Sequence, residues 1–269
     1  MSGGLIGLLV GDALGVPYEF RAPHELPSPE LIEYEPPPRF RRSHPGAAVG
    51  AWSDDGAQAL CLLASLLHCD RLDLRDFGNR LCNWHQVGYM AVNNHLFDIG
   101  IQTSEALNRL RAGTPPEESG GAEDWSQGNG SLMRVLPLAL WHRGSDAELV
   151  RDAHEQSLPT HGHPTVQACC ALYCLWARGL LEDAADPWGA AVATLRGLYR
   201  DQPVYLAALN DQIRPEEARA PGGSGFVIDS LFSARHALEA GPYEAVVKAM
   251  GSSQTASPRA ERDARWDLN

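Results

Sequence analysis

The residues best suited to chemistry in this sequence are a hydroxyl and two adjacent carboxylates, Ser53-Asp54-Asp55. Ser53 is a favourable N-cap before an apolar helical pattern, so both carboxylates fall in the first turn of a predicted helix. Hard oxygen ligands of this kind suit Mg²⁺. Acidic first turns are also common as plain helix caps, so the three residues indicate either a divalent-metal site or a cap.

A second pair of carboxylates lies near the N-terminus, where Asp12 interrupts an apolar run and Glu19 follows it. A charge among apolar residues is costly unless it is paired, so Asp12 requires a partner such as an arginine or a helix N-terminus. Glu19 comes just after the predicted helix and could face a cleft as a general base or a gate. Simple pairing and a catalytic role remain equal alternatives for these two residues.

Three further segments combine glycine with polar residues at predicted helix starts. Residues 128–134, GNGSLMR, form a glycine-rich turn whose free backbone N–H groups suit phosphate. His161 and His163 flank a glycine, but no other cluster completes a metal site with them, so a capping or ligand-contacting loop is favoured. Residues 222–226, GGSGF, offer either a flexible turn or an aromatic platform for a base. For residues 128–134 the alternative is an ordinary capped helix start.

The elements that must position these residues are helices, because helical periodicity runs through the chain and alternating strand patterns are nearly absent. We expect an all-α fold with function carried on long loops and helix starts. The predicted domain is one compact multi-helix unit over residues 1–250, followed by an atypical, disordered tail over 251–269. Helices are predicted at 3–15, 53–69, 74–91, 100–112, 131–142, 146–157, 164–182, 187–200, 225–240 and 242–250.

The composition narrows the class of protein further. A formal net charge of −12 disfavours binding to nucleic acid, although local amides can still hold a small anion. The six cysteines form no CxxC pair and mostly lie in apolar helical runs, which indicates buried hydrophobes in a reducing compartment. The N-terminal apolar run is short and lacks a basic flank, so we expect no signal peptide, no membrane partner and a cytoplasmic location.

Taken in order, six segments resemble the ADP-ribosylglycohydrolase family, which contains dinitrogenase reductase-activating glycohydrolase. They span about residues 3–249 and read GLLVGDALGVPYEF, GAWSDDGAQAL, FDIGIQTSEAL, GNGSLMRVLPLAL, THGHP, and GSGFVIDSLFSA with a following YEAVVKA. Each motif is modest alone, but six in the same order are specific. The resemblance implies an all-α fold and a hydrolase that removes ADP-ribose from a modified side chain or small molecule.

The resemblance also implies a binuclear Mg²⁺ or Mn²⁺ site with Ser53, Asp54 and Asp55 as metal ligands. Glu19 would be the acidic residue beside the scissile bond, so that Glu19, Asp54 and Asp55 form the catalytic set. Asp98 would support the metal-bound water or a ligand, the glycine-rich turn and THGHP would line the ribose and diphosphate, and GSGF would lie near the distal ribose and adenine. The implied substrate-binding residues are Asp98, Asn129, Gly130, Ser131, His161, Gly225 and Phe226.

One departure from the family pattern concerns the C-terminal region. The family continues after the YEAVVKA helix with an Asp-x-Asp-Thr metal motif, and no such motif occurs in these 269 residues. We therefore expect a truncated or altered C-terminus that removes half of the metal site and impairs hydrolysis. Two hypotheses stand beside an impaired hydrolase: a non-catalytic ADP-ribose-binding or regulatory protein, and a structural or partner-dependent remnant. The sequence leaves the linkage, the metal and the oligomeric state open.

Overall fold

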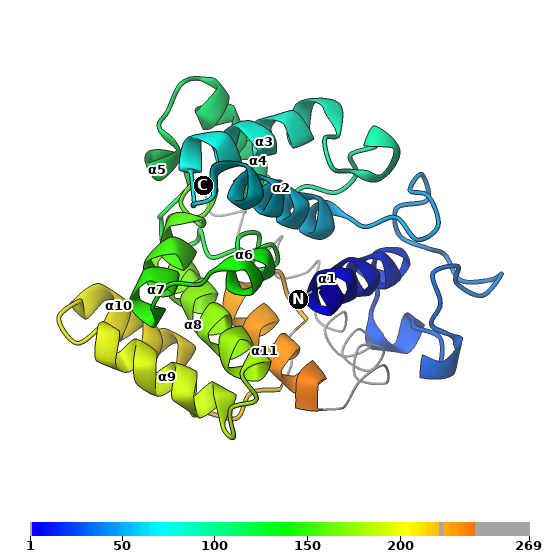
Figure 1. The fold of residues 1–269 in the computed structure, drawn as a ribbon. Coiled ribbons are helices and arrows are strands. Elements are labelled where there is room, and N and C mark those ends of the chain that lie inside the picture. The colour runs from blue at the N-terminus through cyan, green and yellow to red at the C-terminus, as the bar shows by residue number, and fades with distance from the viewer. Residues whose placement is uncertain (1, 221–222, 240–269) are drawn as a thin grey trace.

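The fold consists of helices joined by irregular segments, as the computed structural model shows for residues 2–220 and 223–239 (Figure 1). Over those residues there is no β-strand, only two isolated bridges. The prediction of an all-α fold is therefore confirmed. The helices are α1 Ser2–Gly15, α2 Asp54–Cys69, α3 Leu74–Val87, α4 Ile101–Arg111, α5 Pro116–Ser119, α6 Leu136–Trp141, α7 Asp146–Glu155, α8 Pro164–Leu181, α9 Pro187–Leu198, α10 Pro203–Ala207 and α11 Val227–Glu239.

Local capping explains where several helices begin and end. The Ser53 hydroxyl accepts from the Asp55 N–H at the start of α2, and Ser145 with Glu148 forms a reciprocal capping box at the start of α7. Helix α3 ends at Gly88, whose φ of 68° is easy for glycine. These ends depend on near neighbours in the sequence, so most helix bounds agree with the predicted ranges to within a few residues.

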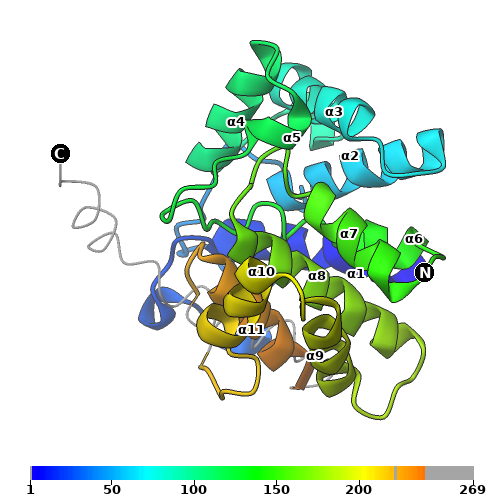
Figure 2. The same cartoon turned by 90° about the vertical axis from the view of Figure 1, so that its left-hand side faces the viewer.

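Helix α8 is the centre of the core. It is apolar around nearly its whole circumference and packs against α6, α7, α9 and α11. Short α6 contacts α1 and α2 on one side and α8 on the other, so it joins the two halves of the molecule. Figure 2 shows α2, α3 and α4 on one side of the central helices and α9 to α11 on the other. All six cysteines are free, and four of them are buried, as the apolar pattern predicts.

Three segments differ from their predicted form. The helix predicted from residue 131 begins only at Leu136, because residues 131–134 form turns that start from the Asn129 carbonyl. The stretch expected to be irregular over 201–223 contains α10 and a π-helical turn, Ala208–Ile213. The helix predicted at 242–250 and the tail predicted at 251–269 lie outside the described residues.

The long excursion between α1 and α2 contains only short 3₁₀ turns, Val16–Tyr18, Pro23–Glu25 and Pro29–Leu31. It is anchored by a small apolar cluster of Leu14, Tyr18 and Ile32. The Tyr18 hydroxyl donates to the Glu33 carbonyl at 2.8 Å. The excursion is therefore packed against the end of α1, and it returns to the start of α2 from the same side.

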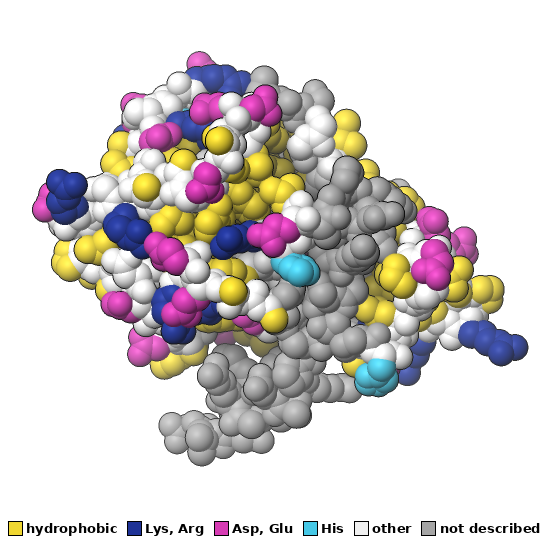
Figure 3. Space-filling model, turned by 90° about the horizontal axis from the view of Figure 1, so that it is seen from below, with side chains coloured by type: hydrophobic (Ala, Val, Ile, Leu, Met, Phe, Trp, Pro, Cys, Tyr) yellow, Lys and Arg dark blue, Asp and Glu magenta, His cyan; other side chains and the backbone are white. Residues whose placement is uncertain are grey.

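The described surface carries mixed charge. On the face seen in Figure 3, Lys and Arg are interspersed with Asp and Glu, so no basic patch forms among the described residues there. None of the described helices combines the length and apolar character that crossing a bilayer requires.

Candidate functional site

The junction between α1 and α2 is built on Asp12. One oxygen of Asp12, Oδ2, accepts from the backbone N–H groups of Ser53 at 2.9 Å and Gly56 at 2.8 Å. The other oxygen accepts from the Ser53 hydroxyl at 2.7 Å. A Cβ on Gly56 would lie 2.9 Å from Asp12 Oδ2 and 2.8 Å from Leu9, so only glycine allows this approach. Asp12 is thus paired with a helix N-terminus, as one of its two predicted alternatives states.

Five carboxylates gather at this junction, namely Asp12, Glu19, Asp54, Asp55 and Asp98. Burial, and then the charge of Asp55, raise the pKa of Asp54 well above its usual value. Burial and then Asp12 do the same for Asp55, and burial raises the pKa of Asp12 to about 6. Within the described chain, no Lys or Arg forms an ion pair with any of the five. Ionisation of these carboxyls is therefore costly in the protein alone, and a bound cation would offset that cost.

Glu19 has one strong partner, and sequence reasoning missed it. His44 Nε2 lies 2.7 Å from Glu19 Oε2, and a donor atom of Asp98 lies within 4.8 Å of both. Burial raises the pKa of Glu19, while the hydrogen bond from His44 lowers it. His44 comes from the proline-rich excursion, where no periodicity or motif marks it. Its only sequence signal is being a histidine between two predicted elements.

The glycine-rich turn lies beside the start of α11. Asn129 donates its backbone N–H to the Gly225 carbonyl at 3.0 Å and its side-chain amide to Ser230 at 2.9 Å. Gly128 and Phe226 form an isolated antiparallel bridge. The predicted residues Asn129, Gly225 and Phe226 are therefore together, although about 100 residues separate them. Phe226 remains 37% exposed, so part of this residue is accessible to a ligand.

The turn also presents free backbone donors. Over the residues that the structure describes, the N–H groups of Gly130 and Ser131 have no protein acceptor. Two consecutive free N–H groups in a turn form a concavity that attracts anions. Ser131 is fully buried, and its hydroxyl lies 2.7 Å from that of Ser157.

His161 packs against the glycine-rich turn. Its Nδ1 lies 2.8 Å from the Thr160 hydroxyl, and a Cβ on Gly130 would approach its Cε1 to 2.7 Å. Burial, with a further contribution from Arg134, lowers the pKa of His161 to about 3, so the imidazole is neutral. His163 instead caps α8, with Nδ1 accepting from the Thr165 N–H at 3.2 Å. The first histidine belongs to the site, and the second only begins a helix.

Arg134, which the sequence did not single out, ties the two halves of the site together. It is fully buried and donates to Gln58 Oε1 at 2.9 Å and to the Gln156 carbonyl at 2.8 Å. Gln58 in turn lies one helical turn after Asp54 and donates to it at 3.4 Å. The carboxylate cluster and the glycine-rich turn are thus linked through one buried guanidinium.

These donors fit a divalent cation. Carboxylate and hydroxyl oxygens are the ligands that Mg²⁺ and Mn²⁺ prefer. The charge at Asp54 and Asp55 is buried and lacks a basic partner among the described residues. Ser53 Oγ already takes part in two hydrogen bonds, with Asp12 and with the Asp55 N–H, which leaves one lone pair for a metal. Asp54 and Asp55 are therefore the stronger candidate ligands of the predicted set.

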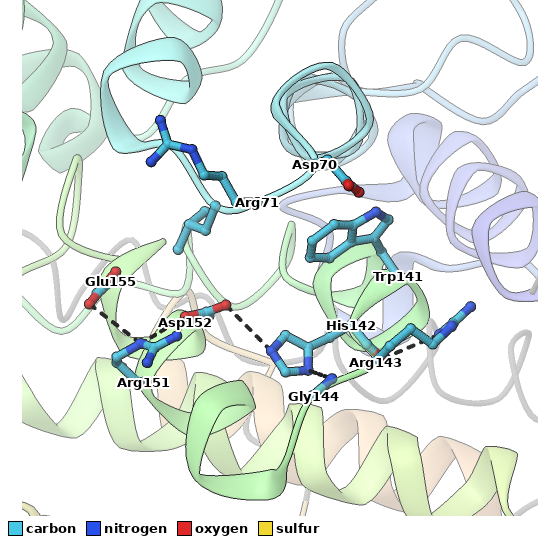
Figure 4. A pocket seen from close by; sticks show the side chains of 10 residues that line it. Asp70, Arg71, Trp141, His142, Arg143, Gly144, Arg151, Asp152 and Glu155 are labelled. Atoms are coloured by element: carbon cyan, nitrogen blue, oxygen red, sulfur yellow. Dashed lines mark hydrogen bonds and ion pairs between the residues drawn. The ribbon is translucent and has the colours of Figure 1, made fainter.

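A separate cavity of about 690 Å³ lies at the opposite end of α2 (Figure 4). Its acidic and basic side chains already neutralise one another, since Arg151 pairs with Asp152 at 2.8 Å and with Glu155 at 3.9 Å. His142 also pairs with Asp152, at 3.4 Å. This cavity contains none of the predicted site residues, and its pairing contrasts with the uncompensated charge of the carboxylate cluster.

Comparison with known proteins gives consistent similarities. The ADP-ribosylglycohydrolase family model matches residues 1–254. The chain is 31% identical over 242 residues to ADP-ribosylarginine hydrolase Tri1 of Serratia proteamaculans (strain 568), covering 88% of this chain and 61% of that protein. It is 31% identical over 179 residues to ADP-ribosyl-dinitrogen reductase glycohydrolase of Rhodospirillum rubrum, covering 62% of this chain and 53% of that protein.

A solved structure described as an ADP-ribosylglycohydrolase-related protein complex is also similar. It matches with a TM-score of 0.66 and 26% sequence identity, over 94% of this chain and 81% of that chain. The chain spans about three fifths of the length of the Tri1 protein that it matches.

Proposed function

The chain belongs to the ADP-ribosylglycohydrolase family, and from this premise we propose that it hydrolyses the glycosidic bond of an ADP-ribosylated substrate with the help of a divalent cation. The observation that carries the proposal is the cluster of five carboxylates, none of which pairs with a Lys or Arg among the described residues, next to a turn with free N–H groups. A cation and an anionic ligand would each find complementary charge there.

The substrate that the family relatives favour is ADP-ribosylated arginine. Two similar proteins are named for hydrolysis of ADP-ribosylarginine and of ADP-ribosyl-dinitrogen reductase. The guanidinium of a bound ADP-ribosylated arginine is positively charged, so a site rich in carboxylates suits it electrostatically. We therefore propose an arginine-linked ADP-ribose as the substrate.

Each part of the site has a proposed role in binding. The free N–H groups of Gly130 and Ser131 donate to the diphosphate, and Phe226 offers its exposed ring face to the adenine. Asn129 and neutral His161 line the ribose between them, and Asp98 supports the water or the ligand. An added Cβ at Gly225 would meet no described atom within 4 Å, so there is open space at this position.

Each carboxylate has a proposed role in the reaction. Asp54 and Asp55, with the remaining lone pair of Ser53, would hold the cation, which when bound orients the ribose hydroxyls and stabilises negative charge. Glu19 lies beside them, where its carboxylate accepts a proton from the attacking water. Water would then attack the anomeric carbon through an oxocarbenium-like transition state. The bond from that carbon to the arginine nitrogen breaks, and the guanidine leaves with the electron pair and takes up a proton.

A release assay tests this proposal. The protein is incubated with an ADP-ribosylated arginine peptide and Mg²⁺ or Mn²⁺, and free ADP-ribose is quantified by chromatography and mass spectrometry. We expect release by the wild type and a loss of more than about 100-fold in Asp54→Asn, at least as large as the loss of an outer-shell metal partner. Asp211→Asn, an exposed carboxylate in the π-helical turn, serves as the matched control and should leave the rate unchanged.

Two outcomes would contradict the proposal. If folded wild-type protein releases no ADP-ribose with any divalent cation but binds it in calorimetry, a non-catalytic ADP-ribose-binding role replaces hydrolysis. If Asp54→Asn retains the wild-type rate, the reaction does not depend on the carboxylate cluster.

A further inference from the structure

Three potential metal ligands from separate parts of the chain meet at one point. Glu19 follows the 3₁₀ turn after α1, His44 belongs to the excursion before α2, and Asp98 precedes α4. One donor atom of each, including an imidazole nitrogen of His44, lies within 4.8 Å of the others. Donor atoms this close can contact one cation at about 2.0–2.2 Å after small shifts of the side chains.

The position of His44 is held by its surroundings. Its ring centroid lies 5.2 Å from that of Phe97 and 5.8 Å from that of Phe20, so aromatic rings contact it from two residues. His44 and Asp98 have positive φ values of 48° and 54°, and they are among nine such non-glycine residues in the described chain. Backbone of this kind is maintained only where the surrounding structure imposes it. The hydrogen bond with Glu19 and the two aromatic contacts hold the imidazole beside Glu19.

Pairing with Glu19 alone does not account for this arrangement. A protonated His44 would balance one negative charge, while Asp54, Asp55 and Asp98 would still lack a basic partner among the described residues. The charges of Glu19 and Asp98 also act on Asp54 and Asp55, because both raise the pKa values of that pair. The three ligands therefore share one electrostatic environment with the proposed cation site.

The second cluster of potential ligands in the described chain differs in this respect. His68, Cys69 and Asp76 also have donor atoms within 4.8 Å of one another. There, however, Arg80 already forms an ion pair with Asp76, with Nε 2.6 Å from one carboxylate oxygen. That cluster carries no surplus negative charge, so it gives no reason for a cation to bind.

We propose that His44 is a nitrogen ligand of a divalent cation in this chain, together with Asp98 and one carboxylate oxygen of Glu19, and beside Asp54 and Asp55; the other oxygen of Glu19 stays available to accept the proton of water. This inference rests on the proposed function and adds a ligand to its cation site. Imidazole suits first-row transition ions, whereas Mg²⁺ is bound mainly by oxygen. The site should therefore favour Mn²⁺ or a later transition ion over Mg²⁺.

Pulsed electron paramagnetic resonance of the protein loaded with Mn²⁺ alone tests the inference directly. A coordinated imidazole produces ¹⁴N modulation in the echo decay of bound Mn²⁺. We expect this modulation in the wild type and its loss in His44→Asn. His95→Asn is the matched control, because His95 is exposed and its ring lies 6.0 Å from Phe97 without belonging to the cluster; the modulation should persist there.

A second measurement keeps the inference testable if the spectra of the variant are weak. Competition between Mn²⁺ and Mg²⁺ is followed in the wild type and in His44→Asn, with circular dichroism to confirm that both are folded. We expect His44→Asn to lower the affinity for Mn²⁺ by at least about tenfold and the affinity for Mg²⁺ much less.

Three results would overturn the inference: no bound Mn²⁺ in the wild type, bound Mn²⁺ without ¹⁴N modulation, or modulation that persists in His44→Asn. These results are separable from a failure of the proposed function. ADP-ribose release without nitrogen coordination rejects the role of His44 and leaves hydrolysis intact. Nitrogen coordination without release supports His44 as a ligand and rejects hydrolysis.

Discussion

Asp12 is the side chain that joins helix α1 to the start of helix α2. It accepts three hydrogen bonds, two from backbone N–H groups and one from the Ser53 hydroxyl. Ser53 in turn caps the helix that carries Asp54 and Asp55. The position of both carboxylates therefore depends on a residue in a different helix, 42 positions before Asp54.

Removing the Asp12 side chain should destabilise the protein measurably. In Asp12→Ala, the three donors lose their acceptor inside a half-buried junction, and we expect a loss of about 2–4 kcal/mol in the free energy of unfolding. Asp12→Asn should lose about 1 kcal/mol or less, because the amide oxygen accepts the same N–H groups and the repulsion from Glu19 disappears. Urea unfolding in the presence of EDTA measures both. Equal stability of the two variants would reject this account of the junction.

The glycine-rich turn shows how neighbouring elements set the shape of the site. Gly130 is enclosed, since an added Cβ would lie 2.7 Å from His161 Cε1 and 3.1 Å from the Thr103 hydroxyl. Both of those side chains are buried and cannot move freely. Gly225, on the strand-like segment that faces this turn, has nothing within 4 Å of such a Cβ. Packing therefore requires glycine at position 130, whereas no packing contact among the described residues requires glycine at position 225.

This difference predicts opposite outcomes for two similar substitutions. Gly130→Ala should lose about 1–3 kcal/mol in the free energy of unfolding, because the new methyl group displaces His161. It should also weaken ADP-ribose binding, since the free N–H groups move with the turn. Gly225→Ala should stay within about 0.5 kcal/mol of the wild type. Thermal melting and calorimetry with ADP-ribose measure both effects, and a stable, tightly binding Gly130→Ala would contradict the packing described here.

Several helix starts were predictable from the sequence, because they depend on residues that are adjacent in the chain. The cap at Ser53 and the two carboxylates of the first turn of α2 follow from residue types in adjacent positions. The helix predicted from residue 131 was wrong at its start, because Asn129 closes a turn before Pro137 allows α6 to begin. The direction of the Ser131 hydroxyl was not predictable either, since it depends on Ser157, 26 residues away.

At the scale of the whole molecule, the periodicity of the sequence predicted the all-α class, and the resemblance carried by six ordered motifs is confirmed by the family model over residues 1–254. What periodicity does not contain is the convergence of distant segments. Glu19, His44 and Asp98 come from separate irregular stretches, and only tertiary packing brings them together. His44 was missed for this reason, although it makes the strongest contact of Glu19.

The expectation of an impaired metal site came from the absence of an Asp-x-Asp-Thr motif, and it stays a prediction. The described residues place five carboxylates and one imidazole around the start of α2. These donors come from separate segments of the chain, so their ability to bind a catalytic cation depends on the folded molecule as a whole. Measuring how the rate of hydrolysis depends on the cation concentration tests whether these donors bind a cation tightly enough for catalysis.

The most direct test is therefore the initial rate of ADP-ribose release from an ADP-ribosylated arginine peptide, measured on EDTA-treated protein as free Mn²⁺ or Mg²⁺ is increased. The account predicts no release in EDTA and a saturable rise of the rate with the cation, reaching half of its maximum at a lower concentration of Mn²⁺ than of Mg²⁺. Release that continues undiminished in EDTA would contradict it, and so would folded protein that releases no ADP-ribose at any concentration of either cation.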